Sequence, residues 1–162
     1  MPGIPNRYMT HWRRHPDLQG KLHPEYPDDL QVVIHDGGLR FSDRRPEAVW
    51  VRISDNRGDV FAGQVLNAPA QLKSVRQGQT ILFLARTGTE HALMVTEKYL
   101  MERPAWEIGP CDRCGLAELF DAPSDLLRVA FPNLPAGAAL ETFTSFCPLC
   151  GGVQVLQARS AP

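Results

Sequence analysis

The chain has no long apolar run and no marked excess of charge of either sign. Its 162 residues include 17 basic and 18 acidic side chains, for a formal net charge of −1. This charge gives no overall attraction to nucleic acid or to an anionic membrane, and no apolar stretch is long enough to span a bilayer. Met1–Asn6 lacks the layout of a secretory signal. The expected location is therefore the cytoplasm.

Sequence signatures of catalysis are also missing. The chain has neither the phosphate-binding pattern G-x-x-x-x-G-K nor a strand-linked G-x-G-x-x-G. No elbow motif presents a serine or cysteine nucleophile. Apolar residues at 43% and charged residues at 22% are ordinary values for a globular protein. We therefore expect a binding protein rather than an enzyme, with no small-molecule substrate.

Cysteine is scarce, and the four that occur fall into two matched pairs. The first pair is Cys111-x2-Cys114, and the second, after 32 intervening residues, is Cys147-x2-Cys150. Two residues between cysteines allow a tight turn to direct both thiolates at one metal, and two such turns complete a tetrahedron. A soft set of four sulfurs suits zinc best. The sequence predicts one structural Zn²⁺ per chain, with no open coordination position.

A glycine follows the second cysteine of each pair, Gly115 in one and Gly151 in the other. Glycine adopts the left-handed backbone conformation that closes such a turn. Three other interpretations stay open at this stage: a redox C-x-x-C at a helix N-terminus, two disulfides in an oxidising compartment, and unrelated buried thiols.

This segment resembles the zinc-ribbon family over about the last third of the chain. Strand-like residues Ala139–Phe146 lead into the second cysteine pair, and Gly152–Gln157 returns as a strand. Pro123–Val129 predicts a short helix between the pairs, because it opens with a proline and an early acid. Residues 104–162 carry three basic and six acidic side chains, a net charge of −3. Phosphate binding favours basic surfaces, so this ribbon is not expected to bind nucleic acid.

The middle of the chain has the pattern of a small sheet. Turn residues separate short runs rich in β-branched and aromatic side chains, at Leu30–His35, Ala48–Ile53, Asp59–Leu66 and Gly78–Leu84. We expect a turn at Asp55–Gly58 and a short helix near Thr96–Glu102 capped by Thr96. The predicted fold class is α+β, a small mostly antiparallel sheet or half-barrel followed by the ribbon. The expected division is an N-terminal arm (1–29), an α+β domain (30–103) and the ribbon (104–162).

Residues 30–86 resemble the YegJ-like bacterial domain of unknown function. The resemblance is carried by an aromatic-valine strand, a Phe-x-Gly strand with an Asn-x-Pro turn, and a later glycine turn, at Val49–Ile53, Gly58–Pro69 and Val75–Gln79. It implies a small bacterial α+β domain and no reaction, because no activity is established for that family. The acidic-tryptophan ending of the family has only Pro104–Trp106 as its nearest counterpart here.

Histidine and asparagine supply the other candidate site residues. His11, His15 and His23 could bind a second metal, or form a polar face of the N-terminal arm. His35-Asp36 is better explained as a strand end and turn than as a phosphohydrolase metal pair, because Gly37 follows. His91 beside Glu90 is expected to be solvated. In Asn67-Ala68-Pro69 we expect the asparagine to bond its own backbone in a turn.

Three functional hypotheses result. The first is a non-catalytic protein-interaction module, for example an inhibitor or immunity-type partner of another bacterial protein. The second is a nucleic-acid-associated accessory protein with a zinc ribbon, suggested by the ribbon and by Arg7, Trp12, Arg13 and Arg14. The third is a metal-dependent hydrolase that uses the N-terminal histidines His11, His15 and His23.

Overall fold

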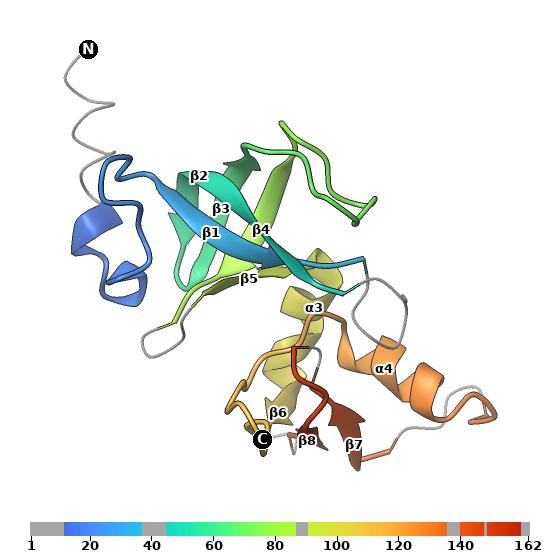
Figure 1. Cartoon of the computed structure of the whole chain (residues 1–162). Helices are drawn as coiled ribbons and strands as arrows, with labels where there is room; N and C mark the ends of the chain where they lie inside the picture. Colours follow the sequence, from blue (N-terminus) through green and yellow to red (C-terminus); the bar gives the residue numbers. More distant parts are fainter. Residues whose placement is uncertain (1–11, 37–44, 87–90, 136–139, 148, 160–162) are drawn as a thin grey trace. The chain divides into compact units, whose positions relative to one another are not determined.

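The structure is a computed structural model, and it describes residues 12–36, 45–86, 91–135, 140–147 and 149–159 (Figure 1). The chain divides into two compact units. The barrel unit comprises residues 1–36 and 46–94, and the cysteine unit comprises residues 37–45 and 95–162. None of the helices within the described ranges is long and apolar enough to cross a membrane.

Five strands form a closed barrel in the order of the sequence. Their bounds are β1 Asp29–Ile34, β2 Glu47–Arg57, β3 Val60–Val65, β4 Thr80–Leu84 and β5 Ala92–Val95. The pairs β1–β2, β2–β3 and β3–β4 are antiparallel, whereas β1 and β5 pair in parallel. The predicted mostly antiparallel α+β sheet is therefore present, but it is a full barrel rather than a half-barrel. The sequence analysis missed β5, a strand of four residues that closes the barrel.

Strand β2 is longer than predicted. The expected turn at Asp55–Gly58 was wrong, because β2 continues to Arg57 and the turn consists of Gly58 and Asp59. The register between β2 and β3 shifts between Ile53 and Asp55. Such a bulge increases the local twist of a strand. This shift lets an eleven-residue strand curve with the barrel.

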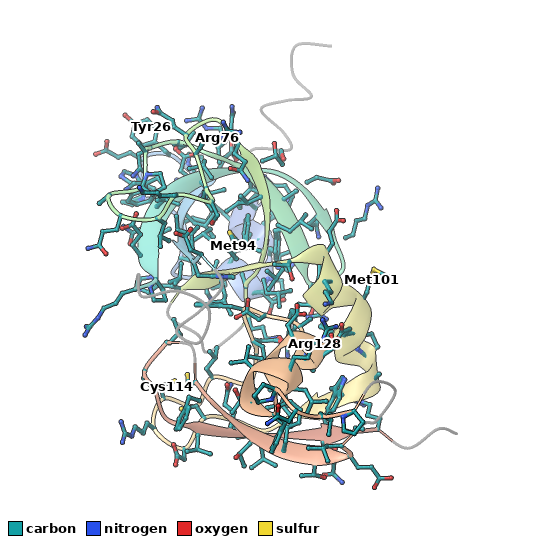
Figure 2. All side chains as sticks on the ribbon, turned by 90° about the vertical axis from the view of Figure 1, so that its right-hand side faces the viewer. Tyr26, Arg76, Met94, Met101, Cys114 and Arg128 are labelled. Carbon is teal, nitrogen blue, oxygen red and sulfur yellow. The ribbon has the colours of Figure 1, made fainter. Side chains whose placement is uncertain are left out.

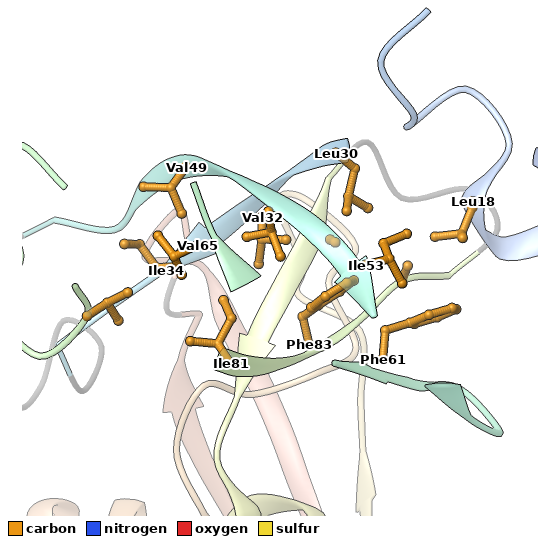
Figure 3. Close-up of a cluster of buried hydrophobic side chains, with 14 of the residues drawn as sticks. Leu18, Leu30, Val32, Ile34, Val49, Ile53, Phe61, Val65, Ile81 and Phe83 are labelled. Atoms are coloured by element: carbon orange, nitrogen blue, oxygen red, sulfur yellow. The ribbon is translucent and has the colours of Figure 1, made fainter. Parts of the chain in front are cut away.

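The barrel interior is filled by alternate apolar residues of the strands (Figure 3). Leu30, Val32 and Ile34 of β1 are fully buried, as the two-residue period of a strand requires. Phe61 and Phe83 stack with ring centroids 5.6 Å apart. Residues before β1 complete this core: two 3-10 turns, Trp12–Arg14 and Pro16–Leu18, contribute the buried side chains of Trp12 and Leu18.

The cysteine unit contains two helices and a three-stranded sheet in the order β6-β8-β7. The bounds are α3 Glu97–Glu102, β6 Trp106–Ile108, α4 Pro123–Ala130, β7 Thr142–Phe146 and β8 Val153–Ala158. Both predicted helices and both strands that flank the second cysteine pair are confirmed, whereas β6 was missed. Its three residues are too few to show a period.

Local hydrogen bonds explain where the two helices begin. The Thr96 side chain accepts from the N–H of Tyr99 at 3.1 Å, which is the predicted cap of α3. Helix α4 begins after Ala122, whose side chain cannot cap it. Glu102 of α3 supplies the missing acceptor, since its carboxylate takes the N–H of Ser124 at 2.8 Å. A carboxylate here also interacts favourably with the positive end of the helix dipole.

Candidate metal centre

The two cysteine pairs adopt the same backbone conformation. In each, the N–H of the glycine after the second cysteine donates to the carbonyl of the first cysteine at 3.0 Å, from Gly115 to Cys111 and from Gly151 to Cys147. Both glycines have φ of +81°, a value that L side chains rarely adopt. The left-handed glycines predicted from the sequence are thus confirmed. The two turns are equivalent halves of one site.

The four sulfur atoms meet at one point of the cysteine unit. All four Sγ atoms lie within 4.8 Å of one another. The Sγ atoms of Cys111 and Cys150 are 3.4 Å apart, and those of Cys114 and Cys147 are 3.6 Å apart. Four sulfurs placed about 2.3 Å from a central ion in a tetrahedron are about 3.8 Å apart. The cluster therefore fits a single tetrahedral ion bound by Cys111, Cys114, Cys147 and Cys150; Cys114 is marked in Figure 2.

Two residues that the sequence analysis missed lock one turn against the other. The Asp112 carboxylate accepts from the N–H of Val153 at 2.8 Å. A side chain at Gly152 would place its Cβ 2.5 Å from the Sγ of Cys111, so this glycine is required by close approach rather than by its backbone angles. The sequence held a signal for this role of Gly152. Gly151 alone is enough to close the turn, so a second glycine directly after it indicates another constraint.

The pKa of Cys111 is shifted downwards, whereas burial raises the pKa of Cys114 in the same turn. Burial would raise the pKa of Cys111, but the N–H groups of Cys114 and Arg113 donate to its sulfur and bring the pKa below its ordinary value. Burial raises the pKa of Cys147. A metal held by all four cysteines requires each as a thiolate. The N–H donors already favour that form at Cys111, whereas at Cys147 it depends on the cation.

The structure bears on the other interpretations of the cysteines. All four are free thiols, so no disulfide joins the pairs in this structure. Neither pair stands at the start of a helix among the described residues, since α4 begins at Pro123 and both turns connect to strands or extended segments. A redox C-x-x-C normally relies on a helix N-terminus to lower the thiol pKa. The geometry therefore favours a metal ion.

The outer face of the small sheet beside this cluster is apolar. Phe146 pairs with Val153 across β7 and β8, and Val155 of β8 pairs with Thr144. Phe146 is 51% exposed and Val155 is 47% exposed, and Val153 and Leu149 are also exposed. We call Phe146, Val153 and Val155, which share the exposed side of β7 and β8, the apolar face. Exposed large apolar residues that gather in this way mark interaction surfaces more often than those that stand singly.

His15 and His23, the two histidines of the third hypothesis that the structure describes, accept hydrogen bonds from nearby backbone N–H groups. His15 accepts the N–H of Asp17 through Nδ1 and lies with its ring 5.0 Å from that of Phe61. His23 accepts from Glu25 and Tyr26 through its own Nδ1. His11 lies outside the described residues. Within the described ranges the grouping of metal-binding side chains contains only the four cysteines and neither His15 nor His23.

The second hypothesis loses its stacking residue. Trp12 is buried in the barrel core with its ring 6.1 Å from that of Phe61, so it presents no surface to a base. Arg13 is exposed, and its guanidinium donates to the carbonyl of Pro24 at 2.8 Å. Arg13 and His23 line an open cavity of about 330 Å³ on the barrel unit. Arg7 lies outside the described residues.

Asp36 and Asn67 stabilise loops of the barrel unit. Asp36 follows β1, and its carboxylate accepts the N–H groups of Lys73 and Ser74, consistent with a structural role at a strand end. The Asn67 side chain accepts the N–H of Trp50 at 2.8 Å. The expectation that Asn67 bonds its own backbone was wrong, because its side-chain oxygen accepts from β2 instead.

His35 makes the stability of the barrel unit depend on pH. Burial lowers its pKa from 6.5 to about 4, against the opposing effects of a Met94 backbone hydrogen bond and of Asp36. The unfolded chain takes up a proton near pH 6.5 and the folded chain only near pH 4, so stability is lost as pH falls through this window. Between pH 7.5 and 5.5 we expect His35 to cost about 1.3 kcal/mol of the free energy of unfolding.

Urea unfolding of the unmodified chain and of His35→Gln at these two pH values measures the effect as the difference between the two chains. The difference is needed because burial raises the pKa of Asp121 to about 7, so this carboxyl titrates in the same window with the opposite sign. His35→Gln should lack the His35 contribution, whatever its effect on stability at pH 7.5. The control is His91→Gln at an exposed position, which should keep the full dependence. Equal slopes for the two variants would show that another group titrates.

Comparison with known proteins identifies no relative. No family model matches the chain, and no curated protein and no solved structure matches it either. The YegJ-like and zinc-ribbon resemblances therefore stay predictions from sequence motifs.

Proposed function

We propose that this protein is a non-catalytic protein-interaction module. In this proposal a structural zinc ion stabilises the cysteine unit, and the apolar face of its sheet binds another protein. An inhibitor of the bound protein is one concrete form of this role. The observation that carries the proposal is the apolar face itself, in which Phe146, Val153 and Val155 are exposed on neighbouring strands.

The donor set supports a structural role for the metal. Four thiolates complete the tetrahedral coordination of zinc, so no position is left for a substrate or an activated water. Cys111 and Cys147 are buried, whereas Cys114 and Cys150 are exposed. Zinc bound here would join the two turns, which are 32 residues apart in sequence, and would supply folding free energy to the sheet.

At the apolar face, β8 exposes apolar side chains and buries a polar one, which is the opposite of the usual arrangement. This reversal supports a role in binding. In β8 the polar Gln154 is fully buried while its neighbours Val153 and Val155 are exposed. Gln154 is accommodated inside because its amide donates to the carbonyls of Leu116 and Glu118 at 2.8 and 3.2 Å. A sequence that places glutamine inside and valine outside departs from the local rule, and such departures concentrate at functional sites.

A charge placed on the apolar face tests this proposal. We expect Val155→Glu to abolish recovery of a specific partner in a native pull-down with the zinc-loaded chain, because burying an unpaired carboxylate at an interface is costly. The matched control is Gln157→Glu, which lies on the same strand and the same exposed side but outside the apolar face. This control should recover the partner as the unmodified chain does.

Two further measurements help to interpret that experiment. Metal content and circular dichroism must be the same in both variants, so that lost binding is not lost folding. A partner that Val155→Glu still recovers would bind elsewhere, and repeated failure of the unmodified chain to recover any protein would contradict the proposal.

A further inference from the structure

Among the strands of the described ranges, none covers one edge of β7. It is the outer strand of the order β6-β8-β7. At its two ends the carbonyl of Glu141 accepts from the N–H of Ala158, and the N–H of Cys147 donates to the carbonyl of Gly152. The backbone groups of Glu141 and Cys147 thus point towards β8. In an antiparallel strand the direction alternates, so those of Thr142 and Thr144 point away from it.

The open edge is otherwise suited to pairing. Among the described residues no backbone hydrogen bond from a further segment reaches Thr142 or Thr144. The strand sequence Thr-Phe-Thr-Ser-Phe contains no charge and no proline, and its register with β8 runs over Thr142–Phe146 without a bulge. Charges, prolines and bulges are the devices by which natural sheets protect their edges, and β7 has none of them.

The opposite edge of the same sheet is protected. Strand β6 has only three residues and carries Glu107. Short length and charge both discourage pairing. Because β7 is longer and uncharged, the contrast indicates that a further strand pairs with its outer edge.

We propose that a second copy of this chain covers the β7 edge. The two β7 strands pair antiparallel about a two-fold axis at Thr144, and the two three-stranded sheets become one sheet of six strands. Thr144 then faces Thr144 of the second copy, and Thr142 faces Phe146. An isologous contact of this kind closes after two copies.

Charge favours a second copy over a strand of another protein. An uncharged strand pairs with itself without like charges placed opposite each other, which would be destabilising. In the two-fold register Glu141, the nearest charge, does not face its own copy. Pairing also brings two apolar faces together on one sheet, since Thr144 and Phe146 share the exposed side with Val155. This inference does not rest on the proposed function.

The association should be weak, because pairing of two five-residue strands buries less area than a typical stable interface. Sedimentation equilibrium of the zinc-loaded full chain, from about 5 to about 200 μM, should therefore show a mass that rises with concentration from 18.0 kDa towards twice that value. A mass of 18.0 kDa throughout would overturn the proposal. Open-ended aggregates would overturn it too.

The two-fold axis at Thr144 allows a charge-pair test. Thr144→Lys and Thr144→Glu should each weaken association by up to about fivefold, because like charges then face each other across the axis. An equimolar mixture of the two should associate more strongly than either variant alone, because lysine then faces glutamate. The same two substitutions at Gln157, on the central strand β8, should leave association unchanged. Association of either Thr144 variant equal to that of the unmodified chain, or a mixture that associates no better than the single variants, would overturn the proposed contact.

A proline supplies a second test that spares the fold. Thr144→Pro removes an N–H that points away from β8, so the β7–β8 ladder keeps its hydrogen bonds, and proline is tolerated at such edge positions. We expect this variant to retain its metal and its circular dichroism and to sediment as a monomer. Association equal to that of the unmodified chain would place the contact elsewhere.

Discussion

Replacing Cys147 with serine is expected to remove the zinc that we predict to bind at one ion per chain and to unfold the cysteine unit. Cys147 is fully buried and its sulfur lies 3.6 Å from that of Cys114, so the serine hydroxyl would leave three sulfurs and no fourth soft ligand. Zinc binding contributes about 10–16 kcal/mol to folding in small zinc domains. The folding free energy lost with the ion should therefore exceed the stability that packing of the sheet and α4 provides.

Metal analysis after purification without chelator measures the first part of this expectation. Hydrogen exchange measures the second: amides of the cysteine unit should lose protection in Cys147→Ser, and those of the barrel strands should keep it. Ser145→Ala is the control, since Ser145 is a buried neighbour on β7 with no part in the sulfur cluster. A metal-free unmodified chain would contradict the zinc prediction, and two ions per chain would return attention to His11, His15 and His23.

Thiol reactivity offers an independent check on the same site. Cys114 and Cys150 are exposed, so they should react quickly with a thiol reagent once the ion is removed. With the ion bound, all four should react slowly, because coordination occupies each sulfur.

The sequence was most informative where spacing alone determines geometry. Two C-x-x-C turns, each with a following glycine, were sufficient to predict the sulfur cluster and the left-handed backbone of Gly115 and Gly151. The cap of α3 was also predictable, because Thr96 acts on a hydrogen bond only three residues away. Local chemistry of this kind needs no knowledge of the rest of the fold.

Features that depend on distant segments could not be predicted. Barrel closure requires β5 to pair in parallel with β1, some 60 residues away, at Val32 with Ala92, and four residues carry no period that identifies the partner. The donor to the Asn67 side chain is the N–H of Trp50, and only the fold brings the two residues together. The role of Gly152 likewise depends on Cys111, which lies across the cluster.

Which side of β8 is exposed also could not be predicted from the sequence. The run Val-Gln-Val-Leu-Gln-Ala at 153–158 contains apolar residues at both phases of a two-residue period, so alternation does not decide which side is inside. Burial of Gln154 and exposure of Val155 follow from the amide donors and carbonyl acceptors of the 116–118 segment. The apolar face therefore could not be predicted without knowing that β8 lies beside that segment.

The second large effect is expected in the barrel unit, where Phe61→Ala should lower the free energy of unfolding by about 3–5 kcal/mol. Phe61 is fully buried, and its ring lies between those of three partners: 6.1 Å from Trp12, 5.0 Å from His15 and 5.6 Å from Phe83. Truncation leaves a cavity that these rings cannot all move to fill, because two of them come from short turns before β1 and one from β4.

Denaturant unfolding followed by tryptophan fluorescence measures that loss, with Tyr26→Ala at an exposed position of the same unit as the control. The control should change stability by less than about 0.5 kcal/mol. Metal content is the decisive second readout, because the four cysteines all belong to the cysteine unit. If the two units fold separately, Phe61→Ala keeps its zinc while the barrel unit unfolds at lower denaturant. Simultaneous loss of zinc and barrel would instead mean that the 162 residues unfold as one cooperative block.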